Sequence, residues 1–598
     1  MTTDLSEKGL ESLIMRHLAG VEGLETGLAD GVAETPDAVA AASAAGTGWI
    51  AGSPAAFDRA HALDVPQLFS FLKETQPDAF KKLGISDYPN PHDIKRLKFL
   101  TRLSAEIGKH GVIHVLRKGI KHESHDFTLF FGTPSPGNAN AAALYAKNRF
   151  SVTRQLRYSM DEKRRALDLC LFINGLPVIT FELKNSLTKQ NAADAEEQYK
   201  RDRDPREKLF GFGRCVVHFA MDDSEVRMCT HLQGKASWFL PFNKGHDDGA
   251  GNPPNPDGLK TDYLWKEMLI PRGLTDILEN YAQIVEVKNP KTGKVKRTQV
   301  FPRYHQLGVV RKALAHAAAH GAGQRYLIQH SAGSGKSNSI AWLAHQLIRI
   351  PAPTSALVHA HANAVLPNLF DSVIVITDRT ILDEQIQKTV KQFMQVSATV
   401  GHAHHSGDLR KFIESGKKII VSTVQKFPFI LDEMAAVTNK TFAIIIDEAH
   451  SSQGGKTSSA MSKALGTNTG EDTEPDAEDI VNAALEARMA ARKMLTNASY
   501  FAFTATPKNK TLEMFGEALP PDAEGKVKHR PFHSYTMKQA IDEGFILDVL
   551  KSYTPVESYY KLIKKIEDDP EFDTKKAKKK LHRKFRSKKP IKLYYKVG

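Results

Sequence analysis

Between residues 300 and 510, short apolar runs rich in β-branched residues alternate with longer segments of helical periodicity. Buried strands that alternate with helices are typical of a doubly wound parallel sheet. Sheets of this kind bind their ligands at the carboxyl ends of the strands. Strands are therefore expected at RYLIQ (325–329), SVIVIT (372–377), KKIIVST (417–423), FAIIID (442–447) and SYFAFTA (499–505), with KSNSIAWLAHQLIRI (336–350) as a connecting helix.

The first of these strands leads into the glycine-rich segment HSAGSGKS and then directly into a helix. This is the P-loop pattern, in which glycines let backbone N–H groups wrap a phosphate chain at a helix N-terminus. Lys336 is expected to reach the β- and γ-phosphates, and Ser337 to ligate Mg²⁺. His330 stands where the pattern usually has glycine, and a loop without a ligand is the alternative. The predicted ATP-binding residues of the loop are Gly333, Ser334, Gly335, Lys336 and Ser337.

The apolar strand expected at 442–447 ends in the sequence DEAH (447–450). Adjacent carboxylates at a buried strand end are costly unless a positive group, such as a Mg²⁺ nucleotide, compensates them. Asp447 is expected to hold the metal ion through water, and Glu448 to orient or deprotonate the attacking water. Together with TATP (504–507) after a later strand, the DEAH sequence resembles the superfamily 2 helicases and translocases.

The same resemblance assigns roles to further motor residues. Gln306 in RYHQ matches the glutamine that hydrogen-bonds the adenine edge, and an ordinary surface glutamine is the alternative. Arg379 in TDRTILDEQ and Thr423 in STVQKF stand where such motors contact DNA phosphates; a solvated or capping role is the alternative. Thr504 and Thr506 match the residues that couple ATP hydrolysis to movement.

Upstream, two apolar runs flank an Asn-Gly pair (174–175), a pattern that predicts a β-hairpin. Asp168 lies among leucines in the first strand, and Glu182 and Lys184 share one face of the second because alternate strand residues point the same way. Two carboxylates can hold Mg²⁺, which activates water, while Lys184 positions that water or neutralises the leaving anion. The pattern resembles the core of the PD-(D/E)xK nucleases; an E-x-K sequence on a solvated strand is the alternative.

Strand register decides whether the two carboxylates can converge. A strict two-residue turn pairs residues whose numbers sum to 349, which sets Asp168 opposite Phe181 and points it away from Glu182. The site therefore requires a three-residue loop or a β-bulge. Pro177 favours a bulge because it has no N–H to donate to the strand ladder.

Three further polar features of the sequence are considered as parts of a catalytic or metal site. Glu11, in the amphipathic segment LESLIMRHL, is a candidate supporting acid for the nuclease. Related nucleases often add a Q-x-x-x-Y helix, but Gln198 is followed four residues later by Asp202, so this motif is not met. The histidine-rich segments HAHANA (359–364) and GHAHHSG (401–407) lack carboxylate support and are interpreted as solvated loops rather than zinc sites.

A nuclease hairpin followed on one chain by a P-loop DEAH motor resembles the restriction (R) subunit of type I restriction-modification enzymes. The likeness extends to FLPFNKG (239–245), TDYLWKEML (261–269) and DEAHSSQGG (447–455). It implies ATP and Mg²⁺ as cofactors, double-stranded DNA as substrate, and modification (methyltransferase) and specificity subunits as partners in a multisubunit complex. It also implies ATP-dependent DNA translocation and Mg²⁺-dependent double-strand cleavage.

The fold class expected from this resemblance is α/β. A restriction-endonuclease-like α/β domain would precede a RecA-like doubly wound parallel-sheet domain and the beginning of a second RecA-like domain. The turn-rich sequence PFNKGHDDGAGNPPNPDG (241–258) places the first boundary. The expected divisions are an endonuclease domain at 1–260, a linker or helical connection at 261–300, a first motor domain at 301–530, and an incomplete second motor domain with a basic tail at 531–598.

The basic tail accounts for most of the charge of the chain. Residues 551–598 hold 16 Lys and Arg against 6 Asp and Glu, so they contribute +10 of the net +14 and leave +4 for the first 550 residues. The net charge alone therefore does not indicate a DNA-binding face. No residue matches the arginine finger that a second motor domain supplies, so we expect little ATP hydrolysis or translocation by this chain alone. The basic ending RKFRSKKPIKLYYKVG is interpreted as a premature terminus of the second motor domain. A naturally basic tail that holds DNA is the alternative.

Composition narrows the cellular setting. Three cysteines without a CxxC pair, and no apolar run of eighteen residues, predict a reducing, cytoplasmic location and no membrane contact. Two other functions stay open. One is a different helicase–nuclease fusion in DNA repair or phage defence, and the other is a catalytically inert nucleotide- or DNA-binding assembly module.

Overall fold

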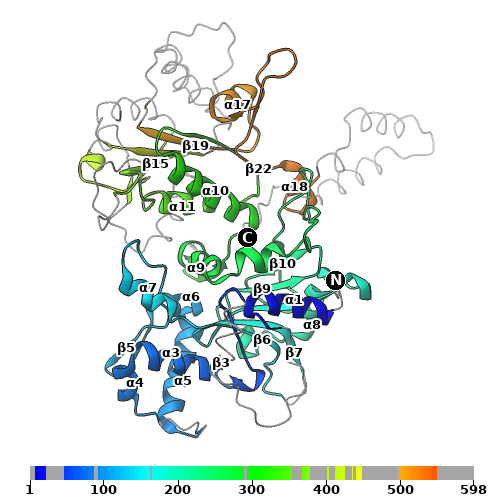
Figure 1. Ribbon diagram of the computed structural model, residues 1–598, viewed down its shortest axis with the longest axis vertical. Helices are drawn as coiled ribbons and strands as arrows, with labels where there is room; N and C mark the ends of the chain where they lie inside the picture. The colour runs from blue at the N-terminus through cyan, green and yellow to red at the C-terminus, as the bar shows by residue number, and fades with distance from the viewer. Residues whose placement is uncertain are drawn as a thin grey trace, which may run out of the picture.

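Within the residues that it describes, the computed structural model contains two seven-stranded sheets, so the expected α/β class is confirmed. In Figure 1 the N-terminal sheet lies in the lower half of the molecule and the second sheet in the upper half, with α9 (Pro271–Asn280) between them. The structure describes residues 7–21, 46–85, 90, 92–161, 165–288, 292–352, 367–377, 400–402, 411–423, 434, 440–447, 495 and 497–548.

The N-terminal sheet is mixed, with its hairpin strands in the centre and helices on both faces. Its strands, in spatial order, are β1 (Ile50–Ala51), β6 (Phe150–Arg157), β7 (Ala166–Ile173), β8 (Leu176–Leu183), β9 (Val217–Met221), β10 (Val226–Cys229) and β11 (Leu240–Pro241). β7 is antiparallel to β6 and β8, whereas β8 and β9 run parallel and are joined by helix α8 (Ala192–Asp202). Cys170 of β7 packs in the cluster under α8, and its neighbour Leu169 packs in the core on the opposite face.

The turn between β7 and β8 has the chemistry that the Asn-Gly pair predicts. Asn174 and Gly175 have φ angles of 50° and 80°, and positive φ at both central residues matches the twist of a tight hairpin. The Asn174 side chain is buried and donates to Leu129 O at 2.9 Å. A Cβ on Gly175 would lie 2.3 Å from Asp64 O, so glycine is required by space as well as by conformation.

The second sheet is parallel throughout and matches the five strands expected from the sequence. Successive residues of the central strands pack into opposite clusters: Ile374 and Ile444 lie in one, and Val373 and Ile445 in the other. A strand buried on both faces is the reason for the continuous apolar runs. In spatial order the strands are β16 (Val400–His402), β17 (Ile419–Thr423), β15 (Ser372–Thr377), β18 (Phe442–Asp447), β19 (Ala498–Thr504), β14 (Arg325–His330) and β22 (His533–Tyr535).

The remaining elements surround the two sheets. The helices are α1 (Glu7–Ala19), α3 (Val65–Thr75), α4 (Pro77–Leu83), α5 (Ile94–His110), α6 (Val112–Lys118), α7 (Ala139–Ala146), α10 (Tyr304–His320), α11 (Lys336–Leu347), α17 (Asn509–Phe515) and α18 (Met537–Asp542). Short strands pair as β2 (Phe57–Asp58) with β3 (Leu63–Asp64), β4 (Ile120–His122) with β5 (His125–Phe127), β12 (Gln283–Lys288) with β13 (Val295–Val300), and β20 (Glu517–Ala518) with β21 (His529–Arg530). Among the described residues, no helix combines the length and apolar character needed to cross a bilayer.

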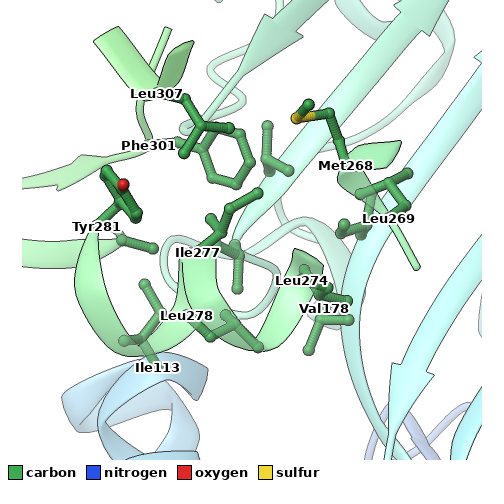
Figure 2. Packing of buried hydrophobic residues seen from close by; sticks show 14 of the residues in the cluster. Ile113, Val178, Met268, Leu269, Leu274, Ile277, Leu278, Tyr281, Phe301 and Leu307 are labelled. Carbon is green, nitrogen blue, oxygen red and sulfur yellow. The ribbon is translucent and has the colours of Figure 1, made fainter. Parts of the chain in front are cut away.

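The segment 261–300 is packed between the two sheets. Ile277 of α9 lies in one continuous apolar cluster with Val178 of β8 and Leu307 of α10 (Figure 2). Trp342 of α11 donates from Nε1 to the carbonyl of Tyr281, just past α9, at 3.2 Å. The helical connection expected here is therefore also a shared core that joins the two sheets.

The strand that follows residue 530 completes the second sheet. β22 pairs in parallel with β14, with Ile328 beside His533 and His330 beside Tyr535. The boundary expected at residue 531 therefore does not coincide with the edge of this sheet, because a three-residue strand is too short to show periodicity in the sequence.

Candidate nuclease and nucleotide sites

The β7–β8 hairpin contains the bulge that convergence of the two carboxylates requires. Near the turn, the numbers of paired residues sum to 349, as for Phe172 with Pro177; further along they sum to 350, as for Leu169 with Phe181. Val178 is the extra residue, and its side chain is fully buried in the cluster of Figure 2. The predicted bulge is confirmed.

The shifted register brings Asp168 level with Glu182 on the face of the sheet that α8 covers. Asp168 is half-buried, and its Oδ2 accepts a hydrogen bond of 2.7 Å from the N–H of Leu183. Glu182 is fully buried. Lys184 is 8 % exposed, and its N–H continues the pairing with β9 by donating to Met221 O, so its side chain keeps the face of Glu182. The structure thus gathers the three predicted nuclease residues at one end of β8.

Arg203, which the sequence interpretation missed, forms a buried ion pair with Glu182. Its Nε donates to Glu182 Oε1 at 2.5 Å, and both side chains are almost fully buried. Burial raises the pKa of Glu182 to about 8; Arg203 opposes this shift, and the nearby Asp168 carboxylate adds to it. The signal in the sequence is indirect: buried carboxylates need a cation, and Arg203 stands one residue beyond the tyrosine position of the Q-x-x-x-Y pattern.

A second buried polar group supports the strand that carries Glu182. Thr180 Oγ1 lies 2.8 Å from Tyr199 Oη of α8 and 2.7 Å from His218 Nδ1 of β9. Burial lowers the pKa of His218 to about 3, so this ring is neutral at physiological pH. The three side chains tie α8 to β8 and β9 directly beside Glu182.

The donor set at this end of β8 fits a divalent cation that prefers oxygen ligands. Glu182 Oε2 is buried and has no hydrogen-bond partner among the described residues. Such an oxygen is costly unless a ligand satisfies it, and Mg²⁺ takes one or two carboxylates together with water and phosphate oxygens. Within the described part of the chain no group of three or more His, Cys, Asp or Glu is gathered for a metal ion.

Glu11 is connected to the strand next to Asp168. It is 2 % exposed on α1, and its carboxylate accepts from Arg154 Nη2 at 3.2 Å and from Gln155 Nε2 at 2.7 Å. The register of β6 with β7 sets Gln155 opposite Asp168. Gln155 has a φ of 50°, which interrupts the ladder at this point.

The segment expected to bind phosphate joins β14 to α11, in the predicted order of strand, loop and helix. Gly333 and Gly335 have φ angles of 76° and 75°, in the left-handed region that favours glycine. Lys336 is 8 % exposed and donates from Nζ to His330 O at 3.3 Å. Ser337 is half-buried in the first turn of α11.

Side chains from the N-terminal turn of α10 hold the carbonyl groups of this loop. The contacts are Arg303 Nη1 to Gly333 O at 3.0 Å, His305 Nε2 to Ser334 O at 2.9 Å, and Gln306 Nε2 to Ser334 O and Gly335 O at 3.1 Å each. The N–H and C=O of a trans peptide point in opposite directions. The N–H groups of Gly335 and Lys336 are therefore aimed away from the turn, as a phosphate cradle requires.

Two residues of this region make contacts that the sequence interpretation did not include. Gln306 Oε1 accepts from Arg303 N at 2.9 Å and Nε2 binds the loop, so a contact with adenine would have to replace one of these bonds. His330 is fully buried, and its Nε2 lies 3.0 Å from His533 Nδ1 of β22. This contact with the neighbouring strand accounts for a side chain where the P-loop pattern has glycine.

The other motor residues lie at the carboxyl edge of the same sheet. Asp447 ends β18 and is 5 % exposed, and Thr504 ends β19 and is fully buried. The register sets Thr504 beside Gln329 of β14, which leads into the P-loop. The structure therefore brings Asp447, Thr504 and the phosphate loop to one edge.

The remaining predicted contacts are only partly described. Thr423 is half-buried at the end of β17, and Thr506 is exposed beyond β19. Glu448 and Arg379 lie outside the described residues, as do HAHANA (359–364), most of GHAHHSG (401–407) and the basic tail.

Helix α18 connects the phosphate loop with the turn-rich segment that follows the N-terminal sheet. Arg303 Nη2, whose guanidinium also holds Gly333, forms a buried ion pair with Glu543 Oε2 at 3.2 Å. Gln539 Nε2 donates to Glu543 Oε1 at 2.9 Å and packs against Gly245. Two more bonds fix α18 to this segment: Thr536 Oγ1 to Asp248 O at 2.6 Å, and Lys538 Nζ to Asp247 O at 3.0 Å.

Two protein families match the chain. Residues 113–237 match the type I restriction enzyme R protein N terminus (HSDR_N), a range that includes β7, β8 and α8. Residues 305–584 match the SWI2/SNF2 ATPase family, a range that includes the P-loop and the DEAH sequence.

The two curated relatives named here are both type I restriction enzyme endonuclease subunits. The type I restriction enzyme HindI endonuclease subunit of Haemophilus influenzae is 23 % identical over 422 residues, which are 68 % of this chain and 35 % of the relative. The SsaAORF53P endonuclease subunit of Staphylococcus saprophyticus is 24 % identical over 427 residues, 68 % of this chain and 37 % of the relative. The chain thus spans little more than a third of the length of these relatives.

Among solved structures, the ATP-dependent Type ISP restriction-modification enzyme LlaBIII bound to DNA aligns over 43 % of this chain and 15 % of that chain, with 16 % identity and a TM-score of 0.23. Along the chain, the match to the R-protein N terminus precedes the match to the SWI2/SNF2 ATPase family. Both curated relatives named above are endonuclease subunits of type I restriction enzymes. The chain is therefore similar to the type I restriction enzyme endonuclease subunits, with a match to the R-protein N terminus followed by a match to the SWI2/SNF2 ATPase family.

Proposed function

We propose that this chain cleaves double-stranded DNA at the site of Asp168, Glu182 and Lys184, and that its second sheet binds Mg²⁺ and ATP to move DNA. Its partners are the modification and specificity subunits of a type I restriction-modification complex. The observation that carries the nuclease proposal is the bulge at Val178. It sets the two carboxylates level on one face, where Glu182 Oε2 is buried without a hydrogen-bond partner.

At the nuclease site, Asp168 and Glu182 would hold Mg²⁺, which when bound supplies Lewis acidity and lowers the pKa of water. Lys184 shares their face and donates hydrogen bonds either to the attacking water or to the leaving oxygen of the phosphodiester. The buried surroundings strengthen these electrostatic interactions.

At the motor site, the loop N–H groups and Lys336 bind the phosphates of ATP. Ser337 and, through water, Asp447 would hold its Mg²⁺, and Glu448 would orient or deprotonate the attacking water. Gln306 contacts adenine by exchanging one of its present hydrogen bonds. Arg379 and Thr423 contact DNA phosphates, and Thr504 and Thr506 couple ATP hydrolysis to the movement of DNA.

Nicking of a supercoiled plasmid by the purified chain in Mg²⁺ or Mn²⁺ tests the nuclease proposal. We expect nicking that EDTA abolishes and that Lys184→Ala reduces by at least about a hundredfold, the usual contribution of positioned proton transfer. Lys235→Ala, which changes an exposed lysine of the same region, is the matched control. Equal activity in the two variants would remove Lys184 from the chemistry.

Binding of a fluorescent ATP analogue tests the motor proposal without requiring turnover. Lys336→Ala should abolish binding while plasmid nicking is retained, because the two sites are built on different sheets. Co-purification with modification subunits separates this proposal from a helicase–nuclease fusion that acts in repair or defence without them.

A further inference from the structure

The side chain of Arg203 joins three strands at the nuclease end of the N-terminal sheet. Arg203 caps the C-terminus of α8, and its side chain is 4 % exposed. The guanidinium donates from Nε to Glu182 Oε1 at 2.5 Å, from Nη1 to Tyr158 Oη at 3.1 Å and from Nη2 to Ala166 O at 2.8 Å. Tyr158 follows β6, Ala166 begins β7 and Glu182 lies near the end of β8.

The two carboxylate oxygens of Glu182 differ in their hydrogen bonding. Oε1 is held by a rigid, planar donor group that is itself anchored at two other points. Oε2 is buried and has no hydrogen-bond partner among the described residues. An ion pair that was only structural would gain from a second bond to the same carboxylate, since guanidinium and carboxylate groups pair readily through two parallel bonds.

We propose that Arg203 is a positioning residue for the metal ion of the nuclease: it fixes the plane of the Glu182 carboxylate so that Oε2 is presented to a divalent cation shared with Asp168. This inference rests on the proposed nuclease function and adds a residue to it. Partners that orient metal ligands typically contribute tenfold to a hundredfold to metal affinity. A lysine would keep the charge but not the three contacts, because an ammonium is a point charge on a flexible stem.

Binding of Mn²⁺ to the full chain, measured by electron paramagnetic resonance without nucleotide or DNA, tests this role directly. Wild-type chain should bind an ion that is lost in Asp168→Asn. Arg203→Lys and Arg203→Met should each weaken this binding by at least about tenfold, with Met the more severe. Arg206→Met is the matched control, because Arg206 is 90 % exposed nearby and should leave affinity unchanged.

Thermal unfolding of each variant separates positioning from folding. Arg203→Lys preserves the buried charge, so a melting temperature close to that of wild type combined with weaker Mn²⁺ binding supports the proposal. Wild-type affinity, or tighter binding, in Arg203→Lys would overturn it. If Arg203→Met does not fold, the Lys variant alone decides. Failure of the wild-type chain to bind Mn²⁺, or identical binding by Asp168→Asn, would instead refute the proposed nuclease site itself.

Discussion

Because one apolar core runs from the N-terminal sheet through α9 to the second sheet, the two halves of the molecule should unfold together. Ile277 is fully buried at the centre of this core (Figure 2). Its truncation to alanine loses about 2.5 kcal/mol at ~0.8 kcal/mol per buried carbon, and the cavity that remains brings the total to about 3–4 kcal/mol. Ile277→Ala should therefore lower the stability of both halves by the same amount.

Urea unfolding followed by the fluorescence of two buried tryptophans measures this coupling. Trp49 packs against Phe150 in the N-terminal half, and Trp342 lies on α11 of the motor half. Variants that retain only one of these tryptophans should give coincident transitions, shifted equally by Ile277→Ala. Ile94→Ala is the matched control, since Ile94 is 68 % exposed and should change stability by less than about 0.5 kcal/mol. Two separate transitions, of which Ile277→Ala shifts only one, would refute a shared core.

Three further predictions concern single positions. Gly175→Ala should destabilise the chain by several kcal/mol more than Gly137→Ala in thermal unfolding, because both glycines have a φ of 80° but only at Gly175 would the new Cβ meet backbone, at 2.3 Å. Burial lowers the pKa of His533 from 6.5 to about 4, so its contribution to stability is present above pH 6.5 and is lost as pH falls toward 4, by up to ~3 kcal/mol. His533→Asn should flatten the dependence of urea unfolding on pH in that range, and an unchanged slope would contradict this origin. Glu543→Gln, which leaves Arg303 buried without its charged partner, should cost about 3 kcal/mol in the same assay.

Five strands of the second sheet could be predicted from the sequence because most of their residues are apolar and pack into the clusters on the two faces of the sheet. The bulge could be predicted as a requirement, since Asp168 and Glu182 cannot converge in the simpler register. Pro177 indicated where the bulge lies, and the extra residue is its neighbour Val178. The burial of Val178 in one cluster with residues of α9 could not be predicted, because these residues are far apart in the chain.

Partners that depend on long-range packing were not visible in the sequence. Arg203 reaches Glu182 because α8 lies across β8 and β9. The sequence does not show where the side chain of a residue at the end of a helix points. β22 was missed because a strand of three residues is too short to show an alternating pattern in the sequence. Its pairing with β14 brings His533 into contact with His330. Gln306 was assigned to adenine by resemblance, whereas its bonds to the P-loop carbonyls follow from the path of the backbone.

The contacts of α18 have a thermodynamic consequence. Gly333 in the phosphate loop and Gly245 beyond the N-terminal sheet are joined through Arg303, Glu543 and Gln539. Packed interfaces of this kind switch between discrete arrangements instead of deforming continuously. Coupling free energies are also reciprocal. Any molecule that displaces α18 by binding to residues 245–249 would change the affinity for nucleotide by the same factor by which nucleotide changes the affinity for that molecule.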